Sequence, residues 1–70
     1  MNFNNPFSNE LNIKTNKKIN RIDIFDDSGR LILTEKSKTD INTSSLHKGI
    51  YIIKITADSN EIISRKAIKN

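Results

Sequence analysis

The chain has 70 residues, which suits one small domain and leaves room for only a modest hydrophobic core. It contains no cysteine, so a disulfide framework and thiolate metal sites are excluded, while oxidising and reducing compartments both stay open. The net charge is +4, from 12 Lys and Arg against 8 Asp and Glu, and the scattered cations are typical of a solvated surface rather than a nucleic-acid interface.

Isoleucine dominates the apolar residues, and because it is branched at Cβ the composition favours strands over helices. The first clear strand is expected within residues 10–14, where Leu11 and Ile13 share one face and polar residues share the other. Residues 1–6 lack the pattern of a signal peptide, and no later run is long enough to cross a bilayer. We therefore expect no direct membrane insertion.

Residues 19–36 predict a β-hairpin. Ile22 and Ile24 line one face of its first strand, and Leu31 and Leu33 do the same on the returning strand. The polar turn of residues 26–29 ends in Gly29, which can adopt a positive φ without steric cost.

The second half of the chain predicts one core strand between two shorter elements. Ile41 is the buried candidate of a short edge strand before it, and residues 61–69 form a last strand after the turn at residues 58–60. The core strand, residues 50–57, is apolar on both faces, which is typical of a central strand. Its faces carry Tyr51, Ile53, Ile55 and Ala57 on one side and Ile50 and Ile52 on the other. Together the elements predict an all-β fold, a small antiparallel immunoglobulin-like Greek-key β-sandwich of about six to seven short strands in a single domain over residues 1–70.

The pattern Leu46-x-x-Gly49-x-Tyr51 predicts a tyrosine that secures the loop before the core strand. In immunoglobulin-like sandwiches such a tyrosine starts a late core strand, and its hydroxyl bonds to the backbone a few residues upstream. Leu46 would fill the core and Gly49 would permit the turn. The motif predicts a fold and no chemistry.

The sequence offers no catalytic, cofactor or metal site. His47 is the only histidine, and a pairing with Ser44 or Ser45 would still need an orienting group and an oxyanion hole that no motif supplies. Asp26 and Asp27 lie in a tight turn, whereas a calcium loop needs alternating carboxylates over about a dozen residues. We therefore expect no enzyme, no cofactor and no bound metal.

Four segments, in order, resemble the C-terminal sorting domain of the type IX secretion system (the Por secretion system family) in its type A form. "FNNPFSNELNI" resembles the opening motif, in which Asn5, Pro6, Leu11 and Ile13 match and Asn4 stands where the first proline of Pro-Asn-Pro is usual. "IDIFDDSGRLI" resembles the middle hairpin. "INTSSLHKGIYIIKI" resembles the most recognisable segment, and "SRKAIKN" resembles the closing strand. The resemblance covers about residues 3–69.

The resemblance implies a function that the residues alone do not give. Such domains end larger exported proteins that cross the inner membrane with their own signal peptide. The folded domain is recognised in the periplasm by the outer-membrane translocon and its shuttle barrel. A cell-surface sortase, a cysteine protease, then typically removes it. We accordingly expect Met1 to be an added start residue, the cargo to lie upstream, and the protein to be secreted or placed on the surface of a Gram-negative bacterium.

The same resemblance implies which residues the partner recognises. Gly49, Tyr51, Lys66 and Lys69 are the first candidates, with Pro6 and Leu46 secondary. Gly49 and Tyr51 could equally serve only the fold. The lysines are the better candidates because terminal charges, which we expect to be solvated, contribute little to folding.

Two other functions fit the same composition. An immunoglobulin or fibronectin III-like adhesion or carbohydrate-binding module would have the same fold. A free-standing nucleic-acid binder would use the net positive charge, but Phe25 and Tyr51 are expected in the core, which leaves no aromatic stacking platform. We therefore expect no nucleic-acid partner.

Overall fold

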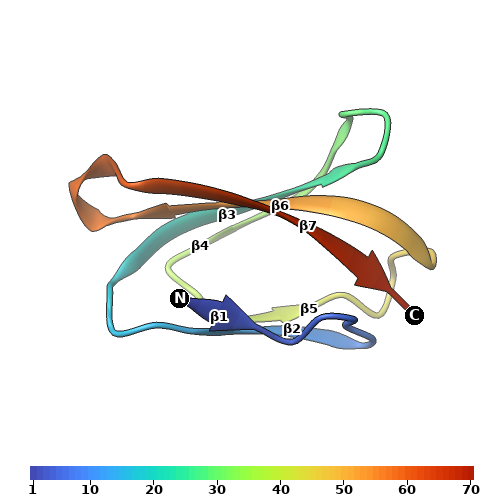
Figure 1. Cartoon of the computed structure of the whole chain (residues 1–70), viewed down its shortest axis with the longest axis horizontal. Helices are drawn as coiled ribbons and strands as arrows, with labels where there is room; N and C mark the ends of the chain where they lie inside the picture. Colours follow the sequence, from blue (N-terminus) through green and yellow to red (C-terminus); the bar gives the residue numbers. More distant parts are fainter.

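Two antiparallel β-sheets pack face to face in the computed structural model, which describes all residues 1–70 (Figure 1). The three-stranded sheet has the order β1 (Asn2–Phe3), β2 (Glu10–Lys14) and β5 (Asp40–Asn42). The four-stranded sheet has the order β4 (Leu31–Lys36), β3 (Ile19–Asp26), β6 (Gly49–Ala57) and β7 (Ile62–Lys69), with a short 3-10 turn, η1 (Asp58–Asn60), between its last two strands. These seven strands confirm the predicted β-sandwich and are consistent with a small immunoglobulin-like fold.

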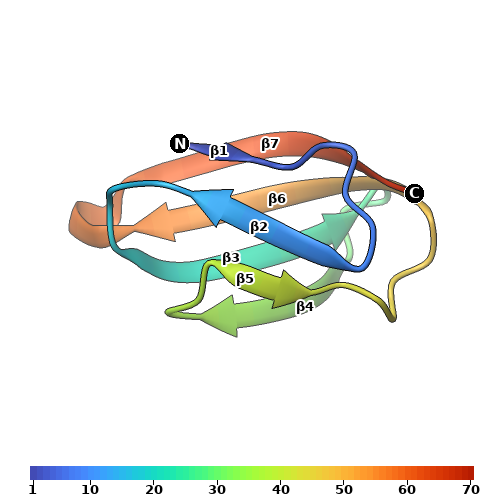
Figure 2. The same cartoon turned by 90° about the horizontal axis from the view of Figure 1, so that it is seen from below.

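The chain changes sheets between its hairpins. β3 pairs with β4 and also with β6, although the chain between β4 and β6 passes through β5 in the opposite sheet (Figure 2). β6 lies between β3 and β7, which confirms that the strand with two apolar faces is central.

The core fills the space between the sheets, and alternation along each strand supplies it. Every inward position predicted for the strands around residues 11–13, 22–24, 41 and 51–57 is buried. The buried apolar cluster consists of Phe7, Leu11, Ile13, Ile19, Ile22, Ile24, Ile41, Tyr51, Ile53, Ile55, Ala57 and Ala67. From the last strand only Ala67 enters this cluster, so β7 adds little side-chain volume to the core.

The prediction for the returning strand of the hairpin is wrong at Leu31. Ile24 pairs with Leu33 but Phe25 pairs with Leu31, so Ile32 is an extra residue on β4. Because side chains alternate along a strand, this bulge turns Leu31 to the face opposite Leu33, where it is 48% exposed. Phe25 lies on that outer face too and is only partly buried, so its predicted core position is also wrong.

The turn between β3 and β4 forms as predicted. Gly29 has a φ of 87°, and the Asp26 carboxylate accepts hydrogen bonds from the main-chain N–H groups of Ser28 and Arg30 and from the Ser28 hydroxyl. These hydrogen bonds, the Ser28 hydroxyl first, lower the pKa of Asp26. The aspartate therefore serves the turn.

Asn4 attaches the leading segment, residues 4–7, to the three-stranded sheet. Its side-chain amide donates to the Glu10 carbonyl at 2.9 Å, and its side-chain oxygen accepts the Asn12 N–H at 2.8 Å. The asparagine side chain thus makes two hydrogen bonds to the β2 main chain that a neighbouring strand would otherwise make. The usual proline could not do this, because it has no side-chain hydrogen-bonding group.

The next residues of the leading segment attach it to the four-stranded sheet. The Asn5 side-chain oxygen accepts the Ile68 N–H at 3.0 Å, and the Phe7 N–H donates to the Ile68 carbonyl at 2.9 Å. The Asn70 N–H then donates to the Phe7 carbonyl at 2.9 Å. Asn4, Asn5 and Phe7 therefore connect β2 of one sheet to the C-terminal end of β7 in the other.

Candidate recognition surface

The residues singled out in the sequence gather at one end of the sandwich, where β6 begins and β7 ends (Figure 1). Gly49 is the Cα partner of Lys69, and Tyr51 is the partner of Ala67. Phe7, directly after Pro6, forms a parallel bridge to Lys69. The fold therefore brings residues from both termini and from the middle of the chain to one place.

Tyr51 adopts the predicted role. Its ring is buried against Phe7, with ring centroids 6.2 Å apart at 59°, and its hydroxyl donates to the His47 carbonyl at 2.6 Å. The bond spans four residues and holds the loop before β6. Tyr51 thus positions this end of the sandwich and offers little surface to a partner.

Gly49 and Leu46 support the same loop. Gly49 is exposed and has a φ of 154°, which side-chain-bearing residues rarely adopt, although a Cβ there would meet no atom within 4 Å. The requirement for glycine is therefore one of backbone conformation. Leu46 is partly buried and packs against the core, as predicted.

The expectation that both terminal lysines are solvated is wrong for Lys69. This residue is 6% exposed, because it shares the inward side of β7 with Ala67 and the leading segment covers it. Its ammonium donates to the Asn70 carbonyl at 3.2 Å. Lys69 thus buries its aliphatic chain at the end of the sandwich, as long cationic side chains often do.

Lys66 and Pro6 are exposed, as a recognition role requires. Lys66 pairs with Ile52 and lies on the outer face of the four-stranded sheet. Pro6 follows a cis peptide bond in the leading segment.

An apolar patch adjoins Lys66 on that outer face. Leu31, Ile50 and Ile68 are 48%, 42% and 49% exposed, and Phe25 and Ile52 lie partly buried between them. The strand register makes these residues neighbours: Phe25 pairs with Leu31 and Ile52, and Ile50 pairs with Ile68. Contiguous exposed apolar surface is a common feature of interaction sites. We call these five residues the outer apolar patch.

The alternation pattern did not predict the outer apolar patch. The feature of the sequence that pointed to it was the second apolar face of residues 50–52. That face predicted a central strand, but the sequence did not show whether another layer of the fold covers it. Leu31 was predicted on the same face as Leu33 because the bulge leaves no mark in the alternation. Residues contributed by four strands become one surface only in the folded sheet.

Beyond the patch, the outer face is mostly polar apart from the exposed Ile62, and it contains one buried carboxylate. Asp23 accepts hydrogen bonds from the Thr34 hydroxyl at 2.8 Å and from Arg21 Nε at 2.9 Å. Burial acts to raise the pKa of Asp23, but these two bonds and the charges of Arg21 and Lys54 outweigh it, so the pKa is lowered. Asp23 is ionised and structural.

The structure shows no group of side chains arranged for catalysis or metal binding. No group of three or more His, Cys, Asp or Glu side chains could hold a metal ion. His47 contributes its main-chain carbonyl to the Tyr51 bond and is exposed. The chain also has no helix of the length and apolarity that crossing a membrane requires.

The domain is a small β-sandwich with an apolar patch beside an exposed lysine. A surface of this kind is suited to binding another protein. Residues 3–70 match the family described as "Secretion system C-terminal sorting domain", and the chain belongs to that family. It is a C-terminal sorting signal for type IX secretion, and the alternative of an adhesion or carbohydrate-binding module is not favoured. No curated protein matches the chain significantly.

Family membership fixes the broad role of the domain. Members act as signals and are not catalytic. The domain therefore interacts with the type IX secretion system and directs secretion or surface export in bacteria.

Proposed function

We propose that the end of the sandwich formed by the start of β6, the end of β7 and the outer apolar patch is the surface that the export machinery recognises. The observation that supports this most directly is the patch itself, because a monomeric domain of this size has no folding reason to expose Leu31, Ile50 and Ile68 together. Lys66 adjoins the patch and supplies a charge that can orient the partner.

The six candidate residues divide into two roles in this proposal. Lys66, Gly49 and Pro6 are exposed and contact the partner. Tyr51, Leu46 and Lys69 are buried or partly buried and position that surface. This division replaces the simpler expectation that both lysines act alike.

The partners in this proposal are the outer-membrane translocon and its shuttle barrel. The domain ends a cargo protein that reaches the periplasm with its own signal peptide, and a cell-surface sortase of the cysteine protease class then removes the domain. The chain itself has no catalytic function, binds no cofactor and does not insert into the membrane. The product is secreted or held on the surface of a Gram-negative cell.

Export of a reporter tests the proposal. The domain would follow a signal peptide and a fluorescent protein in a host with type IX secretion, beside a translocon-deficient strain of the same host. We expect Lys66→Ala and Leu31→Asp each to lower the exported fraction several-fold. Both side chains are exposed, so their substitution removes contacts with the partner and leaves the hydrophobic core intact.

The matched control is Lys36→Ala. Lys36 is also exposed, but it lies at the far end of the same sheet and pairs with Arg21. Its loss should leave export unchanged. Circular dichroism would verify that every variant is folded. Equal export of the Lys66, Leu31 and Lys36 variants would contradict the assigned surface, and export that persists without the translocon would contradict the route.

A further inference from the structure

The outer edge of β7 is open along most of its length. β7 pairs with β6 over its whole length without a register shift, so alternate residues direct their main-chain groups away from β6. Ile68 is one of these, because its N–H and carbonyl bond to the leading segment. By the same alternation, Ile62, Ser64 and Lys66 present their main-chain groups to solvent.

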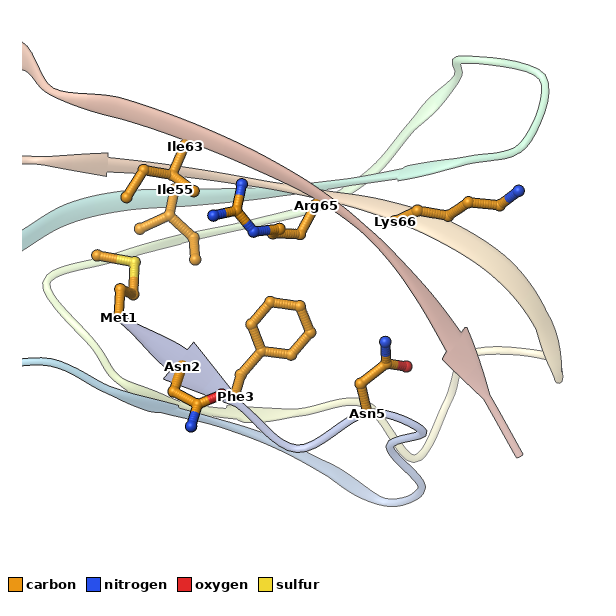
Figure 3. Close-up of a pocket in the computed structure, with 8 residues that line it drawn as sticks. All are labelled: Met1, Asn2, Phe3, Asn5, Ile55, Ile63, Arg65 and Lys66. Carbon is orange, nitrogen blue, oxygen red and sulfur yellow. The ribbon is translucent and has the colours of Figure 1, made fainter.

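A hollow adjoins this edge on the core side. It has a volume of about 210 Å³ and lies between β7 and β1, with Ile55, Ile63 and Phe3 among its lining residues (Figure 3). Arg65 extends along the β7 side of the hollow toward Ile55 and Ile63 in the same view, while Lys66 extends away. An extended segment added to β7 would therefore find unpaired main-chain groups along one side and apolar surface beneath.

The positive charge of β7 favours some partner strands over others at this edge. β7 contains Arg65, Lys66 and Lys69 and no acidic residue. A second copy of β7 added antiparallel would bring cations against cations, which is unfavourable for directly opposed pairs. Edge lysines protect exposed strands against such self-pairing. The same charges attract a strand that contains carboxylates.

We propose that the edge of β7 from Ile62 to Lys66 binds an extended acidic segment of a partner protein by strand addition, with apolar side chains of that segment entering the hollow beside Phe3 and Ile63. Main-chain hydrogen bonds supply affinity in this mode of recognition, and the side chains supply specificity. This surface is distinct from the outer apolar patch. The proposal concerns the isolated domain, so its test does not depend on export.

Amide hydrogen exchange, followed by NMR on the complete chain, tests the proposal. The probe is an acetylated and amidated octapeptide that alternates glutamate and valine. We expect it to slow exchange at Ser64 and Lys66, whose N–H groups point outward. Thr34 on β4 serves as the internal control, because β4 is also an edge strand and the Thr34 N–H points outward by the same alternation. Its exchange should not change.

Two variants separate main-chain pairing from charge. Ser64→Pro removes one outward N–H without removing a bond to β6, which edge strands tolerate. Lys66→Glu reverses a charge on the outer face, where the glutamates of the peptide lie when its valines enter the hollow. Each should weaken binding by about tenfold, a difference of about 1.4 kcal/mol. The same octapeptide with lysine in place of glutamate should not bind, and this control keeps the test decisive if the proline variant fails to fold.

Three outcomes would overturn the proposal. No slowing of exchange at millimolar peptide would show that the edge accepts no strand. Equal slowing at Thr34, or equal binding of the lysine peptide, would show unspecific adhesion. A dimer in analytical ultracentrifugation, with Ser64 and Lys66 already protected in the absence of peptide, would assign the edge to a second copy of the chain.

Discussion

At the scale of single residues, Tyr51 shows how one polar atom organises a candidate site. The ring belongs to the core and packs against Phe7, while the hydroxyl reaches the His47 carbonyl. The loop that it holds leads directly into Gly49 and the start of β6. Loss of the hydroxyl therefore affects both stability and the geometry of the proposed recognition surface.

We expect Tyr51→Phe to lower the free energy of unfolding by about 1–2 kcal/mol, because it removes a buried hydrogen bond and leaves a carbonyl unpaired. Urea denaturation would measure the change. His47→Ala is the matched control, since the acceptor is the main-chain carbonyl and the imidazole is exposed. An unchanged midpoint for Tyr51→Phe, within error, would refute the role of the hydroxyl.

At the scale of elements, the leading segment is as important as any strand. It contains almost no regular structure, yet its asparagines bond to β2 on one side and to β7 on the other. Phe7 adds one of the largest buried side chains of the core. This segment thereby fixes the C-terminal end of β7, where Lys69 is buried.

We expect Asn4→Ala to lower the free energy of unfolding by about 1 kcal/mol, because two hydrogen bonds to the β2 main chain are lost and water replaces them in part. Thermal or urea unfolding would measure it. Asn16→Ala makes the same chemical change at an exposed position outside the strands and should alter stability by less than about 0.5 kcal/mol. Equal effects at the two positions would argue against the proposed attachment.

At the scale of the whole molecule, the surface chemistry of the four-stranded sheet changes along its outer face. The end near Gly49 has the outer apolar patch, whereas the middle of the same face has the Asp23 network with Thr34 and Arg21. The network joins β3 to β4, and the charge of Lys54 on β6 supports it. Global stability should therefore depend on the ionisation of this carboxylate.

The sign of that dependence follows from the lowered pKa of Asp23. The unfolded chain has the ordinary value of 3.8, so as pH falls the unfolded state takes up the proton first. The stabilisation from Asp23 is complete above that value and is lost as pH falls through the lower pKa of the folded state. We expect Asp23→Asn to show a smaller loss of stability between pH 6 and about pH 2 than the parent chain, as measured by urea midpoints. Identical pH profiles would contradict this assignment.

Residue patterns alone predict the fold class and most of the core. Alternation of isoleucine with polar residues identified the strands, because the two-residue period of a strand is visible without knowing its partner. The Leu46, Gly49 and Tyr51 pattern predicted the hydroxyl bond, because the whole device lies within six residues. Motif order likewise identified the family.

Which surfaces stay free depends on contacts made in the folded chain. The bulge that exposes Leu31 depends on the register between β3 and β4, and the burial of Lys69 depends on a leading segment more than sixty positions away. The outer apolar patch and the open edge of β7 exist because no further strand or layer covers them in this fold. Hairpin register and pairing between distant segments set these features, and neither is visible in the alternation along a single strand.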